Sequence, residues 1–138
     1  SRDNARTPLQ WDASKFGGFS TTKPWIDVNE NYNNINVELQ QDNSDSILNY
    51  YREIIRIRKN NSTLIYGDFL DLEPSNEKLY IYKRWNQQKT YFIVLNFSDD
   101  KVQFDINSFE SMRLVISNYK KSVYDKSVDP WEARVYIL

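Results

Sequence analysis

The stretch KLYIYKRWNQQKTYFIVLNF, residues 78–97, decides the fold of the second half of the chain. It contains two short runs of β-branched and aromatic residues, 78–85 and 90–97, separated by the polar turn sequence Asn86-Gln87-Gln88. The segment from Tyr91 to Leu95 has no polar residue at alternate positions, which is typical of a strand buried on both faces. The stretch therefore predicts two strands, the second of them central in a sheet.

Similar short runs follow or precede this stretch and are separated by polar turn sequences such as Ser98-Asp99-Asp100. The expected strands are 63–70, 78–85, 90–97, 101–106, 112–117 and 133–138. Many short strands in succession indicate an antiparallel β-sandwich. Aromatic residues within these runs are expected to fill its core; they are Tyr80, Tyr82, Phe92, Phe97, Phe104 and Tyr136.

Ahead of the strands, the period of apolar residues changes to that of a helix over about residues 45–60. Ser44 or Asp45 is placed to cap its first turn, and the Asn60-Asn61 pair ends it. Its basic residues are expected to form a solvated face; they are Arg52, Arg56, Arg58 and Lys59.

Residues 1–43 show no sustained periodicity and are expected to form a long structured loop. Its aromatic residues, among them Trp11, Phe19 and Trp25, need a surface on which to pack. Left uncovered, they would form an apolar patch and promote self-association of the chain.

Composition excludes several classes of function. The net charge of −1 is the wrong balance for a nucleic-acid-binding protein. The absence of Cys and His removes thiolate chemistry and the usual ligands of zinc, so we expect no metal and no cofactor. No apolar run reaches the length of a membrane span, so we expect no membrane partner, and the lack of cysteine favours a cytoplasmic location.

The opening segment SRDNARTPLQWD, residues 1–12, is the most specific part of the sequence. Pro8 fixes its own φ and restricts Thr7 to extended conformations, so Arg6 immediately precedes a rigid, extended stretch of backbone. Its planar guanidinium suits a carboxylate or the vicinal hydroxyls of a sugar. The alternative is that Arg2 and Arg6 pair with Asp3, Asp12 or other acids to hold the loop.

This segment resembles the sequence R-D-N-A-R-T-P-M-Q-W-D of the oligo-1,6-glucosidase branch of glycoside hydrolase family 13, with Leu9 in place of the usual Met. That branch includes dextran glucosidases and trehalose-6-phosphate hydrolases. The resemblance continues, with gaps, through Pro24-Trp25-Ile26 and 94–98 to the segment PWEARVY at 130–136.

The resemblance implies a mainly β fold: a C-terminal antiparallel β-sandwich of the Greek-key, α-amylase C-terminal type, preceded by one helix and a long loop. Residues 1–61 would form the terminal loop and last helix of a (β/α)8 catalytic barrel, where active-site loops lie. Residues 62–138 would form the C-terminal domain. Within the loop, Arg6 would bind the glucose at the non-reducing end, and Arg2, Asp3 and Asn4 would support it.

Catalysis in this family uses two carboxyl groups in a retaining mechanism. The motifs that carry them are not found in residues 1–138, so none of these residues is expected to be catalytic and the 138-residue chain alone is expected to be inactive. Asp129 and Glu132 flank Trp131 and are expected to face solvent.

The expected function is therefore that of part of an α-glucosidase acting on short α-glucosides, α-1,6-linked ones above all, with the rest of the barrel as partner in cis. Two alternatives remain: a carbohydrate-binding module, suggested by the 21 aromatic residues, and a non-catalytic accessory relative. The sequence does not distinguish isomaltose, maltose, sucrose and trehalose 6-phosphate as substrates.

Overall fold

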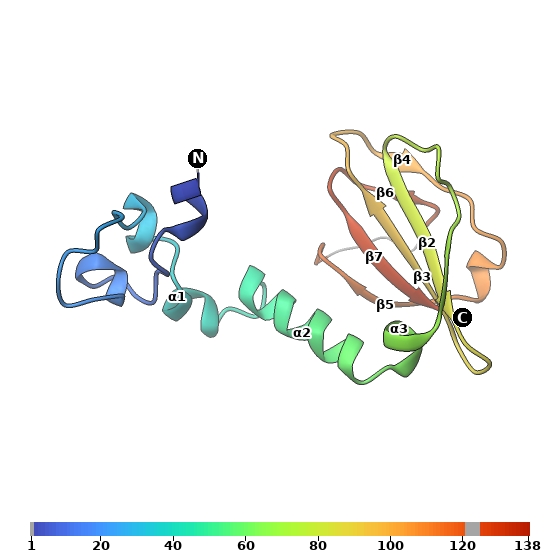
Figure 1. Ribbon diagram of the computed structural model, residues 1–138. Coiled ribbons are helices and arrows are strands. Elements are labelled where there is room, and N and C mark those ends of the chain that lie inside the picture. The colour runs from blue at the N-terminus through green and yellow to red at the C-terminus, as the bar shows by residue number, and fades with distance from the viewer. Residues whose placement is uncertain (1, 121–124) are drawn as a thin grey trace. The chain divides into compact units, whose positions relative to one another are not determined.

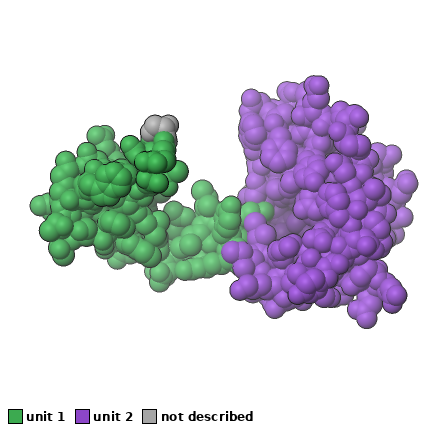
Figure 2. Space-filling model, viewed as in Figure 1, with its two compact units in different colours: residues 1–53 green, residues 54–138 purple. Residues whose placement is uncertain are grey.

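The computed structural model describes residues 2–120 and 125–138, and the chain forms two compact units, residues 1–53 and 54–138 (Figure 2). All the described strands lie in the second unit, and the first consists of short helices joined by loops and the first half of a longer helix (Figure 1).

The 54–138 unit is built on a five-stranded antiparallel sheet with the strand order β1-β2-β3-β7-β5. Its strands are β1 (Asp68–Asp71), β2 (Leu79–Trp85), β3 (Thr90–Asn96), β5 (Arg113–Ser117) and β7 (Ala133–Ile137). A second, two-stranded sheet pairs β4 (Val102–Gln103) with β6 (Ser127–Val128). The expected antiparallel architecture is confirmed.

Strand β3 is the central strand, and it is buried on both faces as its unbroken apolar sequence predicts. Phe92 and Val94 point into one cluster, between the large sheet and the segments that carry β4, β6 and the 3-10 helix η4 (Phe109–Ser111). Tyr91 and Ile93 point into a second cluster on the opposite face, against Leu64. Each fully buried side chain of this size contributes about 1.5–3 kcal/mol, so β3 holds both layers together.

One expected strand is wrong in part. Residues 63–70 begin as the helix α3 (Ser62–Tyr66), and only Asp68–Asp71 form a strand, β1. The guanidinium of Arg84 on β2 donates hydrogen bonds to the carbonyl oxygens of Leu64 and Gly67, at 2.8 and 2.7 Å. These bonds satisfy carbonyls at the end of the helix, and tertiary contact thereby overrides the β-propensity of the segment.

The other expected strands are found, although the one at 101–106 is reduced to two residues and β6 was not predicted. Of the aromatic residues expected in the core, Phe92, Phe104 and Tyr136 are buried, whereas Tyr80 and Phe97 are exposed. Tyr80 lies on the sheet face away from the first cluster, next to the Tyr82 ring at 5.0 Å.

Glu132 does not face solvent, contrary to the expectation from the sequence. It is 1% exposed, and its carboxylate accepts two hydrogen bonds from the guanidinium of Arg134, each 2.8 Å long. Glu132 lies in the turn before β7, and Arg134 lies on β7 itself. Residues two apart in an extended chain share a face, so the two side chains are buried together. Asp129 is only partly buried and pairs with Lys101 at 3.3 Å.

The buried guanidinium of Arg134 has further partners in Tyr136, whose hydroxyl lies 3.2 Å away, and in the backbone carbonyl of Asp125. Burial by itself disfavours the charged guanidinium, but the hydrogen bonds to Glu132 and Tyr136 outweigh it and raise the pKa of Arg134 above its usual value. Arg134 therefore keeps its positive charge inside the core, with the Glu132 carboxyl as its main partner.

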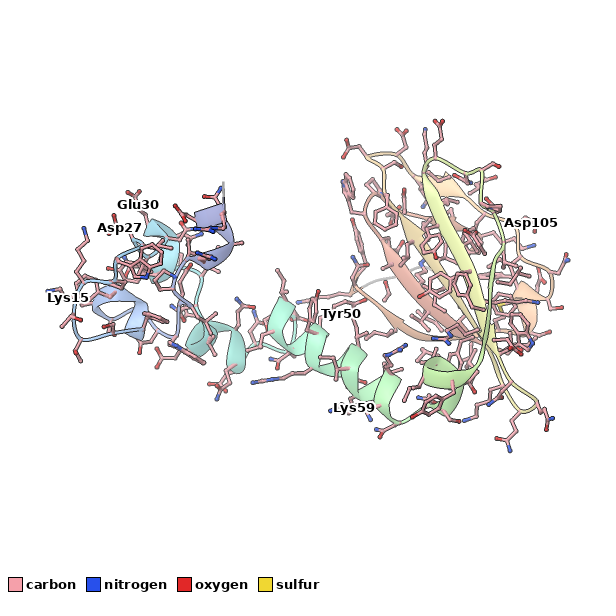
Figure 3. The ribbon with its side chains drawn as sticks, viewed as in Figure 1. Lys15, Asp27, Glu30, Tyr50, Lys59 and Asp105 are labelled. Atoms are coloured by element: carbon pink, nitrogen blue, oxygen red, sulfur yellow. The ribbon has the colours of Figure 1, made fainter. Side chains whose placement is uncertain are left out.

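The 1–53 unit contains three 3-10 helices, η1 (Arg2–Arg6), η2 (Lys15–Gly18) and η3 (Glu30–Asn33), and the short helix α1 (Val37–Gln41). Helix α2 (Ile47–Lys59) matches the helix expected at 45–60 and carries Tyr50 and Lys59 (Figure 3). The basic residues of α2 are exposed, as expected.

The cap of α2 differs from the expectation. Ser46, and not Ser44 or Asp45, accepts a hydrogen bond on its hydroxyl from the N–H of Asn49, at 3.2 Å. At the other end the Asn61 side chain donates to the carbonyl of Ile57, at 2.6 Å. Among the described helices, none combines the length and the apolar character that crossing a membrane requires.

The buried pair generates a stability prediction. Glu132→Ala leaves the charge of Arg134 without its main partner in the core, so we expect a loss of about 3–5 kcal/mol in the free energy of unfolding, measured by urea titration. Lys78→Ala, which breaks the exposed Lys78–Asp100 pair, is the control and should change stability little. Equal effects of the two substitutions would contradict the assignment.

Candidate functional site

The four residues singled out from the sequence, Arg2, Asp3, Asn4 and Arg6, lie together in the single 3-10 turn η1. All four side chains are exposed. Within residues 2–120 and 125–138, no hydrogen bond or ion pair joins these side chains to one another or to Asp12. The alternative in which Arg2 and Arg6 pair with Asp3 or Asp12 to hold the loop is therefore not what the structure contains.

The loop is instead held by the residues that follow Arg6. Pro8 is buried. The Gln10 side chain donates to the amide oxygen of Asn31, at 3.0 Å, and also to the carbonyl of Ile35, and the backbone carbonyl of Gln10 accepts from the N–H of Val37, at 2.9 Å. These bonds tie the opening segment to a part of the chain more than 20 residues later. The turn that carries Arg6 is therefore followed by a segment that is hydrogen-bonded to residues 31–37.

A tight loop follows the anchored segment and is closed by backbone hydrogen bonds. The N–H of Trp11 donates to the carbonyl of Gly17, at 2.7 Å. Gly17 and Gly18 both have positive φ, 63° and 66°, a conformation that glycine adopts without strain. A Cβ at Gly18 would lie 2.5 Å from a carboxylate oxygen of Asp12, so a larger residue there would also displace the Asp12 side chain.

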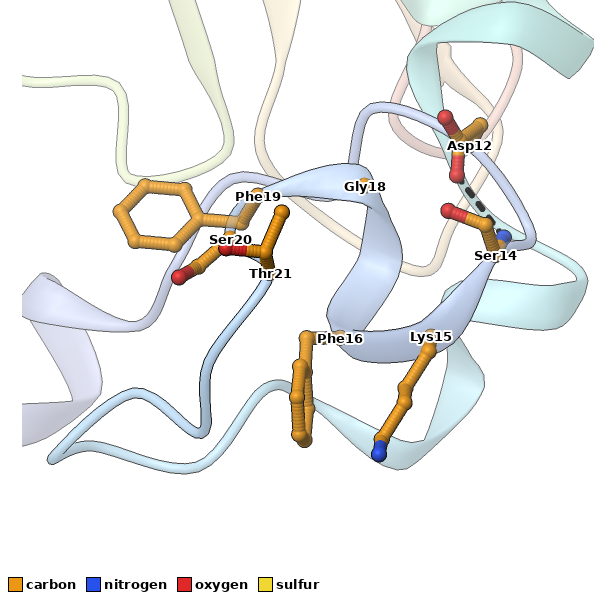
Figure 4. A pocket seen from close by; sticks show the side chains of 8 residues that line it. All are labelled: Asp12, Ser14, Lys15, Phe16, Gly18, Phe19, Ser20 and Thr21. Atoms are coloured by element: carbon orange, nitrogen blue, oxygen red, sulfur yellow. Dashed lines mark hydrogen bonds between the residues drawn. The ribbon is translucent and has the colours of Figure 1, made fainter.

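This loop encloses an open hollow, which is shown in Figure 4. Its lining residues are Asp12, Ser14, Lys15, Phe16, Gly18, Phe19, Ser20 and Thr21. Hydrogen bonds from Ser14 hold the pKa of the Asp12 carboxyl below its usual value. The hollow therefore presents an ionised carboxylate, an ammonium group, hydroxyl groups and two aromatic rings, which together suit a ligand rich in hydroxyls.

Sequence reasoning did not predict this hollow, although the Gly17-Gly18 pair indicates a backbone that must turn sharply there. The hollow is not lined by Arg6 or by the other three residues of η1 named above. The predicted site residues therefore share one turn, but they do not line the hollow.

The 1–53 unit also exposes large apolar side chains, as expected from the aromatic residues of this segment. They are Leu9, Trp11, Phe19, Trp25, Ile35, Leu39, Ile47 and Tyr51. Trp25 is 83% exposed. In the described parts of the chain, no group of three or more His, Cys, Asp or Glu residues is arranged to hold a metal ion.

Two family models match the chain, one for each half. The model described as "Alpha amylase, catalytic domain" matches residues 1–67, and that described as "Beta-galactosidase C-terminal domain" matches residues 78–137. The division between them falls within the segment that joins α3 to β2.

Curated relatives match over the whole chain. The probable oligo-1,6-glucosidase 2 of Bacillus subtilis (strain 168) is 40% identical over 143 residues, which cover 100% of this chain and 26% of that protein. The glucan 1,6-alpha-glucosidase of Streptococcus pneumoniae serotype 4 is 40% identical, in an alignment that covers 96% of this chain and 25% of that protein. The chain therefore spans about a quarter of the length of these relatives.

Solved structures agree with this match. The isomaltulose synthase of Klebsiella sp. LX3 superposes with a TM-score of 0.91 at 35% identity, over 99% of this chain and 26% of its own. The trehalulose synthase of Pseudomonas mesoacidophila MX-45 gives a TM-score of 0.91 at 34% identity, with the same coverage of both chains. The chain belongs to the α-amylase family, glycoside hydrolase family 13, with residues 1–67 matching the model of its catalytic domain and residues 78–137 matching that of a C-terminal domain.

Proposed function

We propose that this chain is the C-terminal part of an α-glucosidase that hydrolyses short α-glucosides from the non-reducing end, α-1,6-linked ones above all. The names of the curated relatives support this reaction. The observation that carries it for this chain is the turn η1, which presents Arg6 on an anchored loop without a partner among the described residues.

Arg6 in this proposal binds hydroxyl groups of the terminal glucose. Its guanidinium offers five donors in a planar fork, which can bridge two adjacent hydroxyl oxygens. Arg2, Asp3 and Asn4 lie in the same turn, and in this proposal they support Arg6 within the complete barrel. The two carboxyl groups of the retaining mechanism come from the preceding part of the catalytic barrel.

The catalytic barrel is also the proposed partner in cis for the exposed apolar side chains of the 1–53 unit. In this proposal, residues 1–61 complete the barrel and residues 62–138 form the C-terminal domain. The complete protein works in the cytoplasm, in keeping with a sequence that has no cysteine for disulfides.

A second candidate reaction is the formation of isomaltulose or trehalulose from sucrose, which the structural matches favour by name. The two candidates are separated by product analysis. Isomaltose and sucrose are incubated with the complete enzyme, and the products are resolved by chromatography. Release of glucose from isomaltose supports the first candidate, and an isomer of sucrose as main product supports the second.

The role of Arg6 is tested in the complete enzyme. Arg6→Ala should lower kcat/KM for isomaltose roughly 10- to 150-fold, since a hydrogen bond from a charged group contributes about 1.5–3 kcal/mol. The Tm should not change, because the side chain is exposed and makes no hydrogen bond to another described residue. Steady-state kinetics and thermal unfolding measure the two quantities.

Two further variants sharpen this test. Arg6→Lys keeps the charge and loses the planar fork, so its kcat/KM should lie between those of the wild type and of Arg6→Ala. Arg52→Ala, which removes an exposed arginine of α2, should have no effect on kcat/KM. An unchanged kcat/KM for Arg6→Ala would refute the substrate-binding role.

The uncovered apolar surface generates a separate prediction. The 138-residue chain on its own should self-associate with rising concentration, because its exposed tryptophans and aliphatic side chains lack their covering domain. Light scattering measures this. The double substitution Trp25→Ser and Ile47→Ser should reduce the association, whereas Tyr66→Ser, at an exposed position of the other unit, should not. A strictly monomeric wild-type chain would contradict the prediction.

A further inference from the structure

Trp131 has a backbone conformation that disfavours its side chain. It occupies the third position of a turn in which the N–H of Glu132 donates to the carbonyl of Asp129, at 3.0 Å. Pro130 takes the second position, and Trp131 has a φ of 57°. This is the arrangement of a type II turn, whose third position favours glycine. A bulky residue in this conformation is strained, and such strain concentrates at functional sites.

The indole ring is exposed and yet held in place. Trp131 is 56% exposed, and its ring N–H donates to a carboxylate oxygen of Asp99, at 2.8 Å. Its backbone N–H donates to the carbonyl of Ser98, at 3.2 Å, and its carbonyl accepts from the amide of Asn118, at 2.9 Å. An aromatic surface fixed in this way loses little conformational entropy when a ligand packs on it.

The turn beneath the ring is rigid as well. The Glu132 carboxylate, already bound to Arg134, accepts a hydrogen bond from the N–H of Asp129, at 2.9 Å. The hydroxyl of the half-exposed Tyr119 donates to the carbonyl of Pro130, at 2.6 Å. The buried ion pair thus supports the base of the turn, while an exposed tyrosine braces its side.

The Asp99 carboxylate lies at the edge of the indole, and other polar groups bond the backbone that carries it. Asp99 supplies carboxylate oxygens, and the Asn118 side chain bonds two backbone groups of the strand end, at Trp131 and Ala133. A flat apolar ring with hydrogen-bonding groups at its rim suits a pyranose, whose C–H face packs on an aromatic ring while its hydroxyls point sideways to polar atoms.

We propose that Trp131 is a saccharide-stacking site on the 54–138 unit, which takes a glucose ring of an α-glucoside against the indole face. The class of sugar rests on the proposed function, whereas the site itself rests on the strained, exposed and fixed tryptophan. The carboxylate of Asp99 orients the ring and is a positioning residue. The 54–138 unit would then bind the substrate at a site separate from Arg6.

The test uses NMR of the 138-residue chain with 15N-labelled tryptophan. The chain has four tryptophans, so four indole N–H signals are expected, and the signal lost in Trp131→Gly identifies Trp131. Titration with isomaltotriose should shift the Trp131 signal in a saturable way. The signal of the exposed Trp25, identified with Trp25→Gly, is the internal control. Glycerol, at a matched concentration of hydroxyl groups, should shift neither signal saturably.

Variants separate binding from folding. Trp131→Gly should have a Tm at least as high as that of Trp131→Ala, because glycine relieves the positive φ. Asp99→Ala should retain the Trp131 signal but weaken the affinity for isomaltotriose. A Tm of Trp131→Gly below that of Trp131→Ala would contradict the strain on which the proposal rests.

The results of these experiments test the Trp131 site independently of the role of Arg6. An isomaltotriose titration that leaves the Trp131 signal unmoved, or moves the Trp25 signal equally, overturns the stacking site whatever the complete enzyme does. A saturable shift at Trp131 supports the site even where Arg6→Ala leaves kcat/KM unchanged, in which case only the proposed role of Arg6 falls.

Discussion

The buried ion pair between Glu132 and Arg134 is the interaction on which the rest of the β-domain depends. Two charges removed from water are tolerated only where each is fully hydrogen-bonded. Here the carboxylate binds the guanidinium twice, accepts from the Ser117 hydroxyl at 3.1 Å and caps the turn at Asp129. The pair therefore links β7, the end of β5 and the turn that presents Trp131.

The sequence predicts the parts of this fold that follow from local pattern. The unbroken apolar run at 91–95 predicts a central strand, and β3 does pack on both faces. Residues 63–70 show where this reasoning fails: the segment has strand-like composition, but the distant Arg84 stabilises a helical turn there. The prediction for Glu132 is wrong for a similar reason. An acidic residue in a turn is expected to be exposed, but Glu132 has a buried partner two residues later, Arg134.

The candidate site is predictable to a similar degree. Residues 2–6 stand out through resemblance, and the restriction imposed by Pro8 indicates a stiff loop, but the bonds of Gln10 to residues 31–37 cannot be read from spacing. The hollow beside Asp12 also depends on two consecutive glycines with positive φ, which fix a close backbone approach. Both features arise from contacts between segments that the sequence does not place side by side.

Contact between Arg6 and the substrate is central to the proposed function. A crystal structure of the complete enzyme with bound isomaltose tests this directly. We expect a nitrogen of the Arg6 guanidinium within about 3 Å of a hydroxyl oxygen of the glucose at the non-reducing end. An Arg6 side chain that points to solvent, or that pairs only with protein carboxylates while the sugar is bound elsewhere, would contradict it.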